Sequence, residues 1–101
     1  MLKHVVLWKL KESAEGNTKQ TNAQNMKQRL LDLANKIEQI ISIEVGINAS
    51  EEDRTYDVIL ITRFDSKNDL DIYVHHPAHQ EFVQYVRNIR DERVVVDFEE
   101  D

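Results

Sequence analysis

Four segments of the chain alternate apolar and polar side chains with a period of two, which is the pattern of β-strands. They cover residues 3–10, 41–48, 56–64 and 93–99. After the first of them, apolar residues recur at steps of three and four, which predicts an amphipathic helix from Ala23. Residues 11–22 are polar and predict a loop, with Asn17 and Thr21 as two possible helix starts. These patterns predict a sheet with helices packed against it.

The region after the third strand is predicted to form a helix in two pieces. Asp65 and Ser66 offer an N-cap for the first piece, and Pro77, the only proline, breaks the helix. Residues 78–88 form the second piece. The order is β-α-β-β-α-β, the ferredoxin-like α+β arrangement of a four-stranded antiparallel sheet with helices on one face. We expect a single domain over residues 1–101.

Both faces of the predicted sheet carry apolar side chains. In the first strand Val6 points to one side and Val5 to the other, and in the third strand Leu60 alternates with Ile59. Helices cover one face only, and large exposed apolar patches are rare in soluble monomers. We therefore expect a homodimer in which two sheets face each other and bury on the order of 1,600 Å².

Composition and charge argue against several classes of function. The net charge is −6, and the only basic cluster, Arg87, Arg90 and Arg93, is interleaved with Asp91 and Glu92, so we expect no nucleic-acid partner. No apolar run approaches the ~20 residues that span a bilayer, so we expect no membrane insertion. The absence of cysteine excludes disulfides, thiolate metal sites and a cysteine nucleophile. We expect a cytoplasmic location and no cofactor.

The segment 72–79 concentrates the titratable side chains. It contains three of the four histidines, and its members of interest are Tyr73, His75, His76, Pro77 and His79. Imidazole titrates near neutral pH, and the helix break at Pro77 is flanked by these histidines and the tyrosine. We therefore predict a site at this break.

Several motifs together resemble the stress-responsive A/B barrel (Dabb) family. They are, in chain order, Lys3–Lys11, Ile43–Asn48, Tyr56–Val58 with Phe64, Tyr73–His79 and Val96–Glu99. The resemblance covers nearly the whole chain. It implies a dimeric α/β barrel formed by two four-stranded sheets, in a family whose members mostly have no assigned reaction.

The resemblance also implies candidate residues. One plant branch of the family acts as polyketide cyclases without metal or cofactor, through a tyrosine and a histidine that match Tyr73 and His79. Their pocket is lined partly by a histidine that matches His4, and His76 with Pro77 is the shared framework. We therefore keep a cofactor-independent cyclase or lyase as an alternative function.

This chain departs from the cyclases at two positions. Val58 stands where they have another histidine, and Leu30 stands where they have a tyrosine. The wider dimeric α/β barrel group also contains small monooxygenases, which gives a further alternative.

Three interpretations of the site remain open. In the first interpretation, Tyr73 and His79 form a general acid–base pair. Its structural alternative is that His79 caps the second helix piece and the Tyr73 hydroxyl binds a backbone carbonyl. In the second interpretation, His75, His76 and His79 would bind a metal ion. Because Pro77 breaks the helix that would align them, we expect no metal site. The third interpretation is a non-catalytic homodimer that binds a small apolar molecule between helices and sheet. The residues predicted to bind the substrate or ligand are His4, Val6, Trp8, Leu30, Val58, Leu60, His76 and Phe82.

Asp97 lies between apolar residues of the last strand. A carboxylate at a buried sheet face needs a partner. We expect Lys3, Lys9 or Arg63, on a neighbouring strand or subunit, to provide it; the alternative is that Asp97 lies at an exposed edge and needs no partner.

Overall fold

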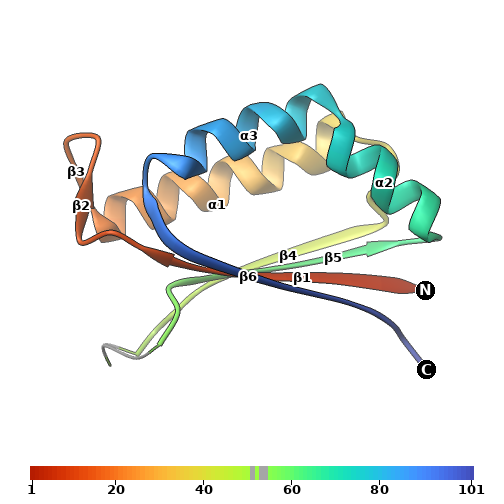
Figure 1. Ribbon diagram of the computed structural model, residues 1–101, viewed down its shortest axis with the longest axis horizontal. Coiled ribbons are helices and arrows are strands. Elements are labelled where there is room, and N and C mark those ends of the chain that lie inside the picture. The colour runs from red at the N-terminus through yellow and green to blue at the C-terminus, as the bar shows by residue number, and fades with distance from the viewer. Residues whose placement is uncertain (51, 53–54) are drawn as a thin grey trace.

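The computed structural model describes residues 1–50, 52 and 55–101, and it contains one four-stranded antiparallel sheet with helices on one face (Figure 1). The sheet has the strand order β4-β5-β1-β6, with β1 (Leu2–Leu10), β4 (Ser42–Ile47), β5 (Val58–Phe64) and β6 (Arg90–Glu99). The helices are α1 (Lys19–Lys36), α2 (Lys67–His75) and α3 (Pro77–Arg87). The predicted ferredoxin-like α+β fold is confirmed. Within the described ranges, no helix is both long and apolar enough to cross a membrane.

The first helix begins earlier than the sequence predicts. The polar segment before it forms a small hairpin of β2 (Ser13–Ala14) and β3 (Asn17–Thr18), turned by Glu15 and Gly16 at φ of 53° and 77°. The helix N-cap is Thr18, whose hydroxyl accepts a hydrogen bond from the Thr21 backbone N–H at 3.2 Å. Strands of two residues have no alternation to detect, so the sequence pattern indicated only a loop.

The break in the second helix lies at the predicted position. Ser66 caps α2, accepting a hydrogen bond from the Asp69 backbone N–H at 3.2 Å, and Pro77 is the first residue of α3. His76 lies between the two helices in an extended conformation, and its Nδ1 accepts a hydrogen bond from the Ala78 N–H at 3.0 Å. The Ala78 N–H therefore does not continue the α2 ladder.

The last strand is longer than predicted and contains a β-bulge. Lys9 of β1 is opposite Glu92, but Leu10 is opposite Arg90, so Asp91 is an extra residue in β6. A bulge of this kind shifts the alternation by one residue. Arg90 and Arg93, three positions apart, therefore point to the same side of the sheet, the side that the helices cover.

The other side of the sheet, here called the open face, is apolar and uncovered, as the alternation predicts. Two rows of apolar side chains run across β5, β1 and β6 on this side. Val94, Val96 and Phe98 of β6 are 45%, 58% and 45% exposed. The open face consists of Val5, Leu7, Ile59, Ile61, Val94, Val96 and Phe98.

We expect Leu30→Ala to destabilise the fold by about 2–5 kcal/mol, because the Leu30 side chain is fully buried between α1 and the sheet. The measurement is urea unfolding at one fixed protein concentration. Gln28→Ala, at an exposed position of the same helix, is the control. Equal unfolding midpoints for the two variants would contradict this packing.

Candidate functional site

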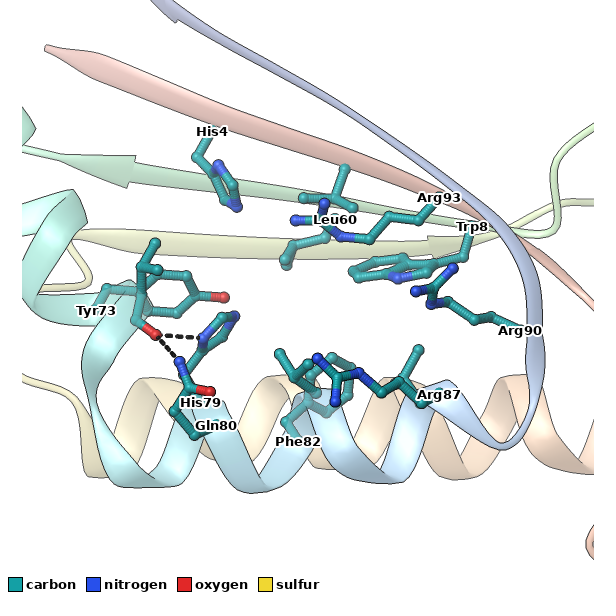
Figure 2. Close-up of a pocket in the computed structure, with 14 residues that line it drawn as sticks. His4, Trp8, Leu60, Tyr73, His79, Gln80, Phe82, Arg87, Arg90 and Arg93 are labelled. Atoms are coloured by element: carbon teal, nitrogen blue, oxygen red, sulfur yellow. Dashed lines mark hydrogen bonds between the residues drawn. The ribbon is translucent and has the colours of Figure 1, made fainter.

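A cavity of about 330 Å³ lies between the sheet and the helices α2 and α3 (Figure 2). This volume is at the lower end of the range of small-molecule sites. The cavity extends to the edge strand β6, which the helices leave uncovered: Val95, on the same side of the sheet as Val6, is 42% exposed. The sequence-predicted residues that line it are His4, Val6, Trp8, Leu60, Tyr73, His79 and Phe82.

Three predicted residues lie outside the lining of this cavity. Leu30 and Val58 are buried in the core, where they are 0% and 2% exposed. His76 caps α3 through its Nδ1. The capping role considered for His79 therefore belongs to His76, and His79 is left for the cavity.

Tyr73 is a buried side chain whose hydroxyl points into the cavity (Figure 2). Its ring packs against Phe64, His4 and His79, with centroid distances of 5.1, 5.9 and 4.4 Å. None of the residues that the structure describes accepts a hydrogen bond from the hydroxyl, so the expected bond to a backbone carbonyl is absent. Burial raises the pKa of Tyr73 well above its ordinary value, so the hydroxyl stays protonated and can donate.

His79 is held in one tautomer by the break in the helix. In a continuous helix the Val74 carbonyl would accept from Ala78, but Ala78 donates to His76 instead. The free Val74 carbonyl accepts from His79 Nδ1 at 2.9 Å and from the Gln80 side-chain amide at 2.7 Å. Since a carbonyl only accepts, Nδ1 carries the hydrogen, and Nε2 keeps its lone pair. Burial lowers the pKa of His79, which favours the neutral, basic form.

The partner of Asp97 is His4, and the predicted partners Lys3, Lys9 and Arg63 are wrong. The antiparallel register places Asp97 directly opposite His4 on the helix-covered side, whereas the other three side chains belong to the opposite side. His4 Nδ1 and Asp97 Oδ1 are 2.5 Å apart, and His4 is only 4% exposed. The pair fixes the orientation of the imidazole at one end of the cavity.

Three arginines that were not predicted from the sequence as site residues also line the cavity. Arg87 comes from the last turn of α3, and Arg90 and Arg93 come from β6 on either side of the bulge. In the part of the chain that the structure describes, no carboxylate forms an ion pair with any of the three. The neighbouring Glu92 is instead bonded by the Tyr56 hydroxyl at 3.1 Å.

Trp8 lines the same end of the cavity as the arginines. It is directly opposite Arg93 in the β1–β6 register, and its ring meets that of Phe82 edge to face at 6.1 Å between centroids. Its indole N–H is buried and, among the described residues, has no acceptor. Buried N–H groups nearly always have a partner, so an unsatisfied donor at this position is unusual.

The described residues contain no group of three or more histidine, aspartate or glutamate side chains placed to hold a metal ion. His75 is exposed, and its Nδ1 lies 2.9 Å from the Asp71 carbonyl on the outside of α2. His75, His76 and His79 therefore engage three different backbone partners.

Comparisons with known proteins agree with this architecture. A model of the stress-responsive A/B barrel domain matches residues 2–100. Among curated proteins, none is similar in sequence. A dimeric protein of unknown function with a ferredoxin-like fold from Bacteroides fragilis is 31% identical; the match covers 97% of this chain and 94% of that chain, with a TM-score of 0.85.

Two plant proteins have the same fold. An Arabidopsis thaliana protein is 27% identical over 100% of this chain and 96% of that chain, with a TM-score of 0.82. The hydroxynitrile lyase of Passiflora edulis is 17% identical over 96% of this chain and 90% of that chain, with a TM-score of 0.76. The second likeness shows the fold alone.

We expect the free energy of unfolding to fall as the pH falls, because His79 takes up a proton more readily in the unfolded chain. Because the pKa of His79 is lower in the folded chain than its ordinary value of about 6.5, the unfolded chain takes up this proton first. The stabilisation by neutral His79 is complete above pH ~6.5 and is lost as the pH falls through the folded pKa. Urea unfolding between pH ~7.5 and ~5 measures the slope, which His79→Asn should make shallower.

The control for this slope is His75→Asn, which removes an exposed histidine outside the cavity. Identical slopes for wild type, His79→Asn and His75→Asn would contradict the burial of His79.

Proposed function

This chain belongs to the stress-responsive A/B barrel domain family, and we propose that its cavity binds a small carbonyl compound on which Tyr73 and His79 transfer a proton. The supporting observation is the pairing of a protonated hydroxyl with a neutral imidazole in one cavity, with ring centroids 4.4 Å apart. Val6, Leu60 and Phe82 offer apolar walls for the body of the ligand.

The proposed step needs no group beyond these side chains. His79 Nε2 removes a proton from the carbon next to the substrate carbonyl. The C–H electron pair forms a C=C bond, and the π electron pair of the carbonyl moves onto its oxygen. The Tyr73 hydroxyl donates a hydrogen bond to the oxygen as its negative charge develops. In simple exchange the protonated imidazole returns the proton to the same carbon. In a cyclisation the enolate carbon forms a bond to a second carbonyl carbon of the substrate, and the imidazole protonates the alkoxide that results. In a lyase reaction the bond to the leaving group breaks as the carbonyl re-forms, and the imidazole protonates that group. The monooxygenase alternative rests on likeness of fold alone.

The test is hydrogen–deuterium exchange next to the carbonyl of cyclohexanone in D₂O, followed by NMR. We expect wild-type protein to accelerate the exchange and His79→Asn to lower the protein-catalysed rate by about 10²-fold or more. Tyr73→Phe should slow exchange without loss of stability, because it removes a hydroxyl that has no partner within the described chain.

His75→Asn is the matched control for this assay and should retain the wild-type rate. A wild-type rate no faster than buffer, or equal rates for wild type and His79→Asn, would refute proton transfer by this pair.

We also propose that the chain forms a homodimer through the open face. The related Bacteroides fragilis protein is dimeric, and it matches this chain over nearly its whole length. Apolar side chains cover three adjacent strands of the open face. A second sheet packed against them would remove this apolar surface from water. The cavity lies on the other side of the sheet, so this association would leave it open.

We expect Val96→Glu to separate the dimer, because two-fold symmetry places two buried carboxylates in one apolar interface. Sedimentation at micromolar concentration should give twice the chain mass of 11.9 kDa for wild type and a single chain mass for the variant. Ile72→Glu, at an exposed apolar position of α2, should keep the dimer mass. A wild type that sediments as one chain would refute the association.

A further inference from the structure

We propose that the substrate of this cavity carries a carboxylate, held by Arg93 with Arg87 and Arg90 while the carbonyl faces Tyr73 and His79. The inference builds on the proposed proton transfer and defines the class of substrate: a small organic acid with an apolar body. Arginine suits this task because its planar guanidinium binds carboxylates through paired hydrogen bonds.

The bulge in β6 brings the positive charges to the cavity. Without the extra residue Asp91, Arg90 and Arg93 would point to opposite sides of the strand. With it, Arg90 is opposite Leu10 and Arg93 opposite Trp8, and both β1 residues are buried on the helix-covered side. Bulges commonly re-aim side chains next to functional sites.

The charges that gather there are uncompensated. The chain has a net charge of −6, so acidic side chains are in excess, yet the described residues include no ion-pair partner for Arg87, Arg90 or Arg93. Figure 2 shows all three extending toward the cavity from α3 and β6. Three unpaired guanidinium groups around one cavity favour an anion among them.

Trp8 supplies a further donor at the same end. Its N–H is buried without an acceptor among the described residues, and its backbone is opposite Arg93. A carboxylate oxygen brought in beside the indole would accept this hydrogen while the arginines neutralise the charge. One ligand group would thus satisfy both the unpaired charges and the unsatisfied N–H.

The charge pattern along β6 fixes the direction of the ligand. Arg93, Val95 and Asp97 share the helix-covered side, with the cation at one end and the carboxylate, bonded to His4, at the other. An anion is attracted to the Arg93 end and repelled from the Asp97 end. Arg93 is also close enough for its charge to act on Tyr73 and His79, whose pKa values it lowers after the larger effects of burial. Because Arg93, Tyr73 and His79 line one cavity of about 330 Å³, the carboxylate and the reacting carbonyl fit one small molecule.

Two probes of matched shape test the inference: cyclohexanecarboxylate and the neutral cyclohexanecarboxamide. Trp8 is the only tryptophan, so its fluorescence reports binding beside the arginines, and calorimetry gives the affinities independently. We expect the carboxylate to bind wild type at least about tenfold more tightly than the amide. Added salt should reduce this preference, because the arginines are accessible to solvent.

Variants assign the preference to the arginines. Arg93→Gln should make the two probes bind about equally, and Arg93→Lys should restore part of the preference through its charge. Lys36→Gln removes an exposed cation from the last turn of α1, as Arg87→Gln does from the last turn of α3. Lys36→Gln should leave the preference for the carboxylate unchanged, and Arg87→Gln should reduce it.

Equal affinities of wild type for the two probes, no binding of either probe, or a preference that survives Arg93→Gln would overturn the inference. Its failure is distinguishable from failure of the proton transfer, because cyclohexanone is uncharged and its exchange depends on Tyr73 and His79. Exchange without a carboxylate preference would refute only the anion site. A preference without exchange would refute only the chemistry.

Discussion

The pairing of β6 with β1 is the constraint on which the candidate site depends. One strand register places Asp97 against His4 and Arg93 against Trp8, and one extra residue in β6 turns Arg90 to the same side. Residues 91–99 of this edge strand are exposed, and the cavity extends to the arginines that the strand carries. A fixed backbone ladder thereby orients an imidazole, an indole and two guanidinium groups toward one cavity.

The two sides of the sheet have different tasks because their residues alternate. On one side the helices bury a core and leave a cavity at the edge; on the other, an apolar surface remains uncovered. A change of one residue in register would exchange the two sets of side chains, so the alternation specifies both the cavity and the open face. Val6 and Val5, adjacent in β1, therefore belong to different surfaces.

Alternation and the helix break were sufficient to predict the order of the main elements, the apolar open face and a site in the segment 72–79. These features depend on the order of neighbouring residues in the sequence, which can be read without knowing the strand register. The choice of Tyr73 and His79 as a pair came from the resemblance to the family. The partner of Asp97 and the role of Arg93 depend on strand register and on the bulge, which involve residues about ninety positions apart. The β2–β3 hairpin was missed because its strands are too short for any period to be recognised.

The break at Pro77 has a consequence for how this chemistry is adjusted. The backbone oxygen released at Val74 decides which imidazole nitrogen of His79 bears its hydrogen, so basicity at the cavity is set by the shape of the main chain. Any relative that straightened this kink would keep the same histidine but lose the acceptor that orders it. Two such proteins would share the same side chains, but only the one with the kink would hold the Nε2 lone pair of this histidine toward the cavity.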